Sequence, residues 1–82
     1  MPHNSFVHLT REEHEELGRE VALTCRRMQE IATLLLQVYG PGNMTAFSAA
    51  KARDAMLRFY RDLAFQAEAD LPGVKIDGYQ QK

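Results

Sequence analysis

With 82 residues, the chain is long enough for one domain and too short for a second hydrophobic core. Its composition, 45% hydrophobic and 26% charged, is typical of a folded domain rather than of a disordered segment. The formal net charge of −1 argues against a dedicated nucleic-acid-binding domain, for which a strongly basic surface is expected. The single cysteine excludes an internal disulfide and a cysteine-rich zinc site.

The sequence shows no feature that would direct the chain to a membrane. No apolar run approaches the roughly 18 residues that a membrane-spanning helix needs. The first residues, Met-Pro-His-Asn, lack the basic and then apolar pattern of a signal peptide. We therefore expect a cytoplasmic protein with no membrane contact.

The N-terminal part divides into an extended arm and a long helix. Residues 1–9 contain a proline and no helical periodicity, so we expect them to be extended. Thr10 then begins a capping box with Glu13, in which each side chain accepts a hydrogen bond from the backbone amide of the other residue. Apolar residues recur with helical spacing from there to Tyr39, which predicts a helix over residues 10–39.

The C-terminal part divides into a turn, a second helix and an extended tail. Gly40 and Pro41 end the first helix, and residues 40–44 form a turn. The alanine-rich segment that follows predicts a second helix over about 45–70, beginning near Thr45 or Ser48. The sequence Leu-Pro-Gly ends this helix, and residues 71–82 are expected to form an extended tail.

Two long helices with a short connection predict an all-α fold, an antiparallel two-helix hairpin. At a rise of about 1.5 Å per residue the helices are about 45 and 39 Å long, so they match well enough to pair along their length.

The apolar stripes of both helices are wider than a hairpin needs. Between Ile31 and Tyr39 only Thr33 and Gln37 are polar, and Leu34 and Leu36 lie 200° apart on a helical wheel. One partner helix cannot cover both leucines, so we expect a homodimer in which two hairpins form a four-helix bundle. The candidate interface residues are Leu34, Leu36, Leu57, Phe59, Tyr60 and Leu63.

No catalytic, cofactor or metal site is predicted. Helical-bundle metal sites use Glu-x-x-His, but the residue three positions before His14 is Arg11. We expect His3, His8 and His14 to be solvated near the end of the first helix. Cys25 lies in an apolar row between Gly18 and Ala32, so we expect a buried, unreactive thiol.

These observations favour a small non-enzymatic protein that acts through protein–protein contacts, as an oligomerisation or adaptor module. The alternative is a small nucleic-acid-binding regulator, although the charge makes nucleic acid a less favoured partner; its basic residues would be Arg19, Arg26, Lys51 and Arg58. Both terminal arms carry apolar residues that a solvated tail does not need. These could pack over the open end of the hairpin or dock a protein partner; they are Phe6, Leu9, Leu71, Val74 and Ile76.

Overall fold

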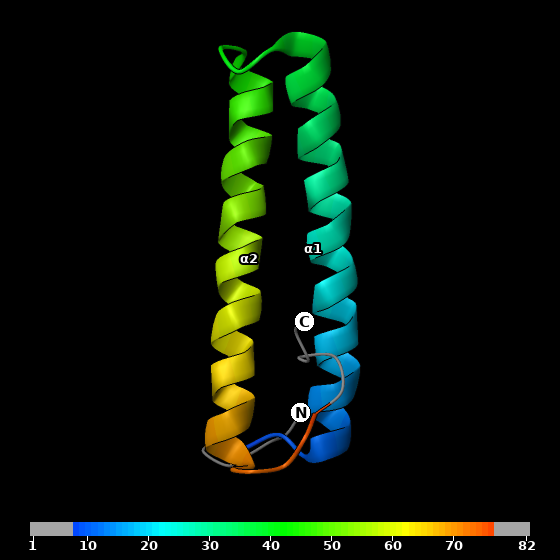
Figure 1. The fold of residues 1–82 in the computed structure, drawn as a ribbon, viewed down its shortest axis with the longest axis vertical. Coiled ribbons are helices and arrows are strands. Elements are labelled where there is room, and N and C mark those ends of the chain that lie inside the picture. Colours follow the sequence, from blue (N-terminus) through cyan, green and yellow to red (C-terminus); the bar gives the residue numbers. More distant parts are fainter. Residues whose placement is uncertain (1–7, 77–82) are drawn as a thin grey trace.

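The computed structural model describes residues 8–76, and in this range it contains two helices and no strand. Helix α1 spans Arg11–Tyr39 and helix α2 spans Met44–Asp70. The two helices run antiparallel, side by side along their whole length, and residues 40–43 join them at one end (Figure 1). The all-α helical hairpin predicted from the sequence is confirmed.

The start and the end of α1 follow from local hydrogen bonding. The predicted capping box is present: Glu13 N donates to Thr10 Oγ1 at 3.1 Å, and Thr10 N donates to Glu13 Oε1 at 2.8 Å. At the other end Gly40 N donates to Leu36 O at 2.9 Å. Gly40 has a φ of 88°, a backbone conformation that side-chain-bearing residues rarely adopt, so the chain leaves the helix there.

Helix α2 begins earlier than its alanine content alone suggested. Asn43 is its N-cap, because the Asn43 side chain accepts a hydrogen bond from Ala46 N at 2.9 Å. The helix therefore starts at Met44 rather than near Thr45 or Ser48, and the turn is correspondingly shorter.

Small residues occupy the contact between the helices. Apart from Val21 and Ile76, the buried apolar residues are Cys25, Ala32, Ala46 and Ala67. Larger apolar side chains flank this narrow contact and are only half-buried; they include Met28, Leu35, Leu36, Met56, Leu57 and Leu63. The molecule is thus one layer of two helices, with a radius of gyration of 15.6 Å. A compact chain of this length would have a radius of about 12 Å.

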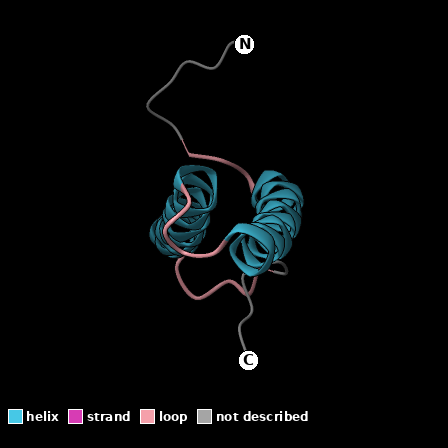
Figure 2. Ribbon diagram, turned by 90° about the horizontal axis from the view of Figure 1, so that it is seen from above, coloured by secondary structure: helices cyan, strands magenta, loops and turns pink. Residues whose placement is uncertain are grey.

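The segments that flank the helices cross the open end of the hairpin. Figure 2 shows that residues 8–10 and 71–76 leave the helix pair on opposite sides. Ile76 is buried, Leu9 and Leu71 are half-buried, and Val74 is exposed. Phe6, the remaining apolar arm residue considered from the sequence, lies outside the described range.

Candidate functional site

A histidine–aspartate pair connects the two helices at the open end of the hairpin. His14 on α1 is fully buried, and its Nε2 lies 2.8 Å from Oδ2 of Asp70, the last residue of α2. The Asp70 side chain is only 8% exposed. Its second oxygen, Oδ1, accepts a hydrogen bond from Gln66 Nε2 at 2.8 Å.

The expectation that His14 is solvated was therefore wrong. His14 lies two helical turns before Val21 and three before Cys25, and all three share the side of α1 that faces α2. The antiparallel pairing brings the end of α2 to the same level, so a carboxylate meets the imidazole inside the hairpin. His8 is exposed, as expected, with Nδ1 2.8 Å from Leu9 O, whereas His3 lies outside the described range.

The pair favours the charged form of the aspartate. The hydrogen bond from His14 is the main cause that lowers the pKa of Asp70, and burial acts in the opposite direction. The hydrogen bond from Gln66 and the charges of His14 and His8 lower this pKa further. A carboxylate and an imidazole can serve as an acid–base pair, but the imidazole must reach a substrate. His14 has no exposed surface, so the pair lies between the helices rather than at the surface of the hairpin.

Cys25 occupies the interior position expected from the sequence. Its Sγ donates to Met56 O on α2 at 3.4 Å. Burial raises the pKa of the thiol, so the nucleophilic thiolate is disfavoured at neutral pH.

Neither a metal centre nor a membrane span was found in the described part of the chain. Residues 8–76 contain no group of three or more histidine, cysteine, aspartate or glutamate side chains that could hold a metal ion. Neither α1 nor α2 is apolar enough over a sufficient length to cross a lipid bilayer.

Large apolar side chains are exposed along both helices. Of the interface candidates, Leu34 is 57% exposed and Phe59 is 47% exposed. The other four are half-buried at the edges of the helix contact; they are Leu36, Leu57, Tyr60 and Leu63. The interface candidates did not include further exposed apolar positions on the two helices, namely Leu23, Ile31, Val38, Tyr39, Met44, Phe47 and Phe65.

The two broad faces of the hairpin differ in charge. Successive residues of a helix project 100° apart, and the two helices run antiparallel. One set of positions on each helix therefore projects to the same side of the two-helix layer. On one side, here called the uncharged face, these positions are Leu17, Thr24, Met28, Ile31 and Leu35 on α1, and Ala52, Met56, Phe59, Leu63 and Gln66 on α2. The opposite side, here called the charged face, includes Arg26 on α1, and Arg53, Leu57, Tyr60, Arg61 and Ala64 on α2.

A shallow depression of about 290 Å³ on the charged face is lined by Leu57, Tyr60, Arg61 and Ala64.

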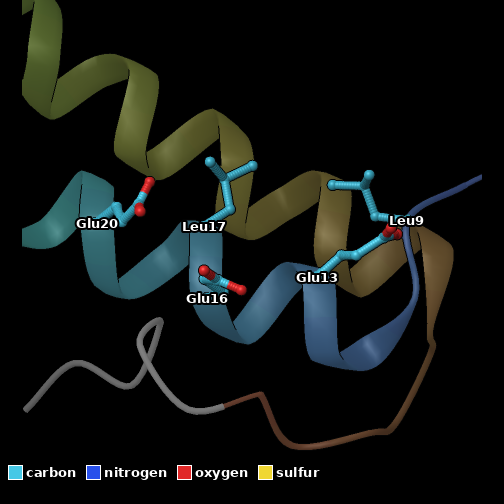
Figure 3. Close-up of a pocket in the computed structure, with 5 residues that line it drawn as sticks. All are labelled: Leu9, Glu13, Glu16, Leu17 and Glu20. Atoms are coloured by element: carbon cyan, nitrogen blue, oxygen red, sulfur yellow. The ribbon is translucent and has the colours of Figure 1, made fainter. Parts of the chain in front are cut away.

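A second depression, of about 280 Å³, lies beside the uncharged face at the start of α1 (Figure 3). Leu9 and Leu17 form its apolar part, and Glu13, Glu16 and Glu20 surround them. The depression is therefore apolar in its middle with an acidic border.

The four basic residues of the alternative function form two separate pairs. All four are exposed. Arg19 and Arg26 project from one flank of α1, whereas Lys51 and Arg58 project from the side of α2 that faces away from α1. Lys51 Nζ lies 5.6 Å from the centroid of the Phe47 ring. A continuous basic stripe, the usual footprint of a nucleic-acid interface, is not formed by these two pairs.

Comparison of the chain with protein-family models, with curated proteins and with solved structures gave no match. The geometry of the hairpin itself is therefore the basis for a functional proposal.

Proposed function

We propose that the protein is a non-enzymatic protein–protein interaction module that assembles as a homodimeric four-helix bundle. The observation that carries the proposal is the single-layer architecture of residues 8–76: large apolar side chains lie at the edges and outer sides of both helices, and no second layer within this range covers them. Domains are normally built from at least two packed layers around one core. A second hairpin would supply the missing layer.

The distribution of side-chain size supports this reading. Small residues fill the contact between α1 and α2, so the two helices approach closely and the larger side chains point to the faces of the hairpin. In a bundle these larger side chains would interdigitate between layers at normal packing density. In an isolated hairpin they would remain in contact with water, and a core of this size supplies little stability.

The proposal is tested by the dependence of thermal unfolding on protein concentration. If folding is coupled to dimerisation, the midpoint temperature Tm rises as protein concentration is raised, because association stabilises only the folded state. A Tm that is constant from about 1 μM to 1 mM would contradict the dimer. A matched scan of a single-chain fusion of two copies should show no concentration dependence, because association is then intramolecular.

A further inference from the structure

We infer that the dimer forms through the uncharged face with the two hairpins antiparallel, so that α1 of one copy lies over α1 of the other. The inference rests on the proposed dimer and assigns its interface and orientation. Each turn, residues 40–43, would then lie over the open end of the other copy.

Two observations favour the uncharged face as the interface: its lack of charge, and the chain segment that covers part of the opposite face. Between Leu17 and Leu35 on α1, and between Ala52 and Gln66 on α2, the positions that define it carry no ionisable side chain, and Glu20 projects at its outer edge. The charged face would instead bury arginines, which is costly unless each finds a partner. It is also partly covered by the chain itself: Figure 3 shows the segment after α2 passing α1 on the side away from Leu17, and this segment contains the buried Ile76.

The available area is sufficient for a stable dimer. The 29 residues of α1 extend about 43 Å, and two helices packed 8–10 Å apart form a face about 20 Å wide. The face therefore presents about 860 Å², close to the roughly 800 Å² that each partner contributes to a standard interface.

The acidic start of α1 selects the antiparallel orientation. In a parallel pair α1 would lie over α2 of the second copy, and Glu20 would lie near the level of Asp62 there, with like charges opposed. In the antiparallel pair, Glu20 instead lies within about one helical turn of Arg27 of the second copy. The depression formed by Leu9 and Leu17 then lies opposite Leu34 and Val38 of the second copy, which are 57% and 61% exposed.

Two threonines on α1 provide a matched test by cysteine cross-linking. Thr24 and Thr33 are both exposed and are nine residues apart, which is two and a half helical turns, so they project from opposite faces. Thr24 lies one residue from the middle of α1, where an antiparallel α1–α1 contact brings each residue next to its own counterpart. Thr24→Cys should therefore form a disulfide-linked dimer under mild oxidation. Thr33→Cys should remain monomeric on a non-reducing denaturing gel, because residue 33 lies on the other face and eight residues from the middle of α1. The wild-type chain, which carries the buried Cys25, shows whether that cysteine cross-links by itself.

A second pair of variants does not depend on disulfide geometry. Ile31 is 42% exposed in the single hairpin, so Ile31→Lys should leave the hairpin folded. It should raise the dimer dissociation constant about 100-fold or more in sedimentation equilibrium, because it buries two lysines at the interface. Thr33→Lys, on the charged face, should leave the constant within about threefold of wild type.

The outcomes separate the inference from the proposed function. The inference is supported if Thr24→Cys cross-links and Thr33→Cys does not, and if Ile31→Lys dissociates the dimer and Thr33→Lys does not. A dimer in which Thr24→Cys does not cross-link, or that persists with Ile31→Lys and dissociates with Thr33→Lys, overturns the inference and leaves the dimer intact. A wild-type chain that sediments as a monomer overturns both.

Discussion

Replacing Asp70 with alanine should destabilise the protein, because the change removes the acceptor of the buried His14 imidazole. The Nε2–Oδ2 distance is 2.8 Å and the two side chains are 0% and 8% exposed, so solvent screens this interaction little. A hydrogen bond that involves a charged group is worth about 1.5–3 kcal/mol in such a position.

One opposing effect reduces this value. Asp70 is the last residue of α2, where the helix dipole disfavours a negative charge by about 0.3–1 kcal/mol, and alanine relieves this cost. The net loss in the free energy of unfolding should therefore be about 2 kcal/mol. For a domain of this size, that loss corresponds to a decrease in Tm of about 8–16 °C at fixed protein concentration.

Thermal unfolding followed by circular dichroism at pH 7 measures the effect, with Asp62→Ala as the matched control. Asp62 is an exposed aspartate on the same helix, so its replacement should change the free energy of unfolding by no more than about 0.5 kcal/mol. Equal effects of the two replacements would refute the role assigned to the His14–Asp70 pair.

The pH dependence gives an independent check of the same pair. The hydrogen bond from His14 holds the pKa of Asp70 below the value of about 3.9 expected in the unfolded chain. A depressed folded-state pKa stabilises the protein fully above the unfolded value, and this contribution is lost as the pH falls through the folded value. The stability difference between wild type and Asp70→Ala should therefore shrink as the pH falls below about 4.

Further predictions concern the ends of the helices and the interior. Gly40→Ala should destabilise the protein by about 1–3 kcal/mol, since its φ of 88° strains any side-chain-bearing residue, whereas Gly42→Ala, without a positive φ, should cost much less in the same denaturant titration. Thr10→Ala removes the capping box and should cost about 1 kcal/mol in that titration; an unchanged midpoint would show that the box is not formed. Cys25 should react with a thiol reagent only as fast as the protein opens, and rapid labelling of the folded chain would contradict its burial. Ile76→Ala should cost about 2 kcal/mol if the segment after α2 packs as described, and no loss would show that it does not.

Local patterns were sufficient to predict the helices. The Thr10–Glu13 capping box and the glycine after Tyr39 depend on residues close together in sequence, and both were found where they were expected. The start of α2 was less clear because Asn43, Thr45 and Ser48 are all good N-caps within six residues. The structure selects Asn43, whose side chain reaches Ala46 N.

The His14–Asp70 pair shows where local reasoning fails. Its two residues are 56 positions apart, and only the antiparallel register of the helices brings them to the same level. The available indication was the position of His14 in the row of Val21, which should have outweighed the general preference of histidine for solvent. The division into an uncharged and a charged face likewise requires the register and the handedness of both helices.

The native mass in solution tests the central claim most directly. Light scattering of the purified chain at about 50 μM should give about 19 kDa, twice the 9.4 kDa of a single chain, because two hairpins are needed to cover the exposed apolar side chains. A mass of 9.4 kDa for a protein with full helicity would show that a single two-helix layer is stable alone, and would contradict the account.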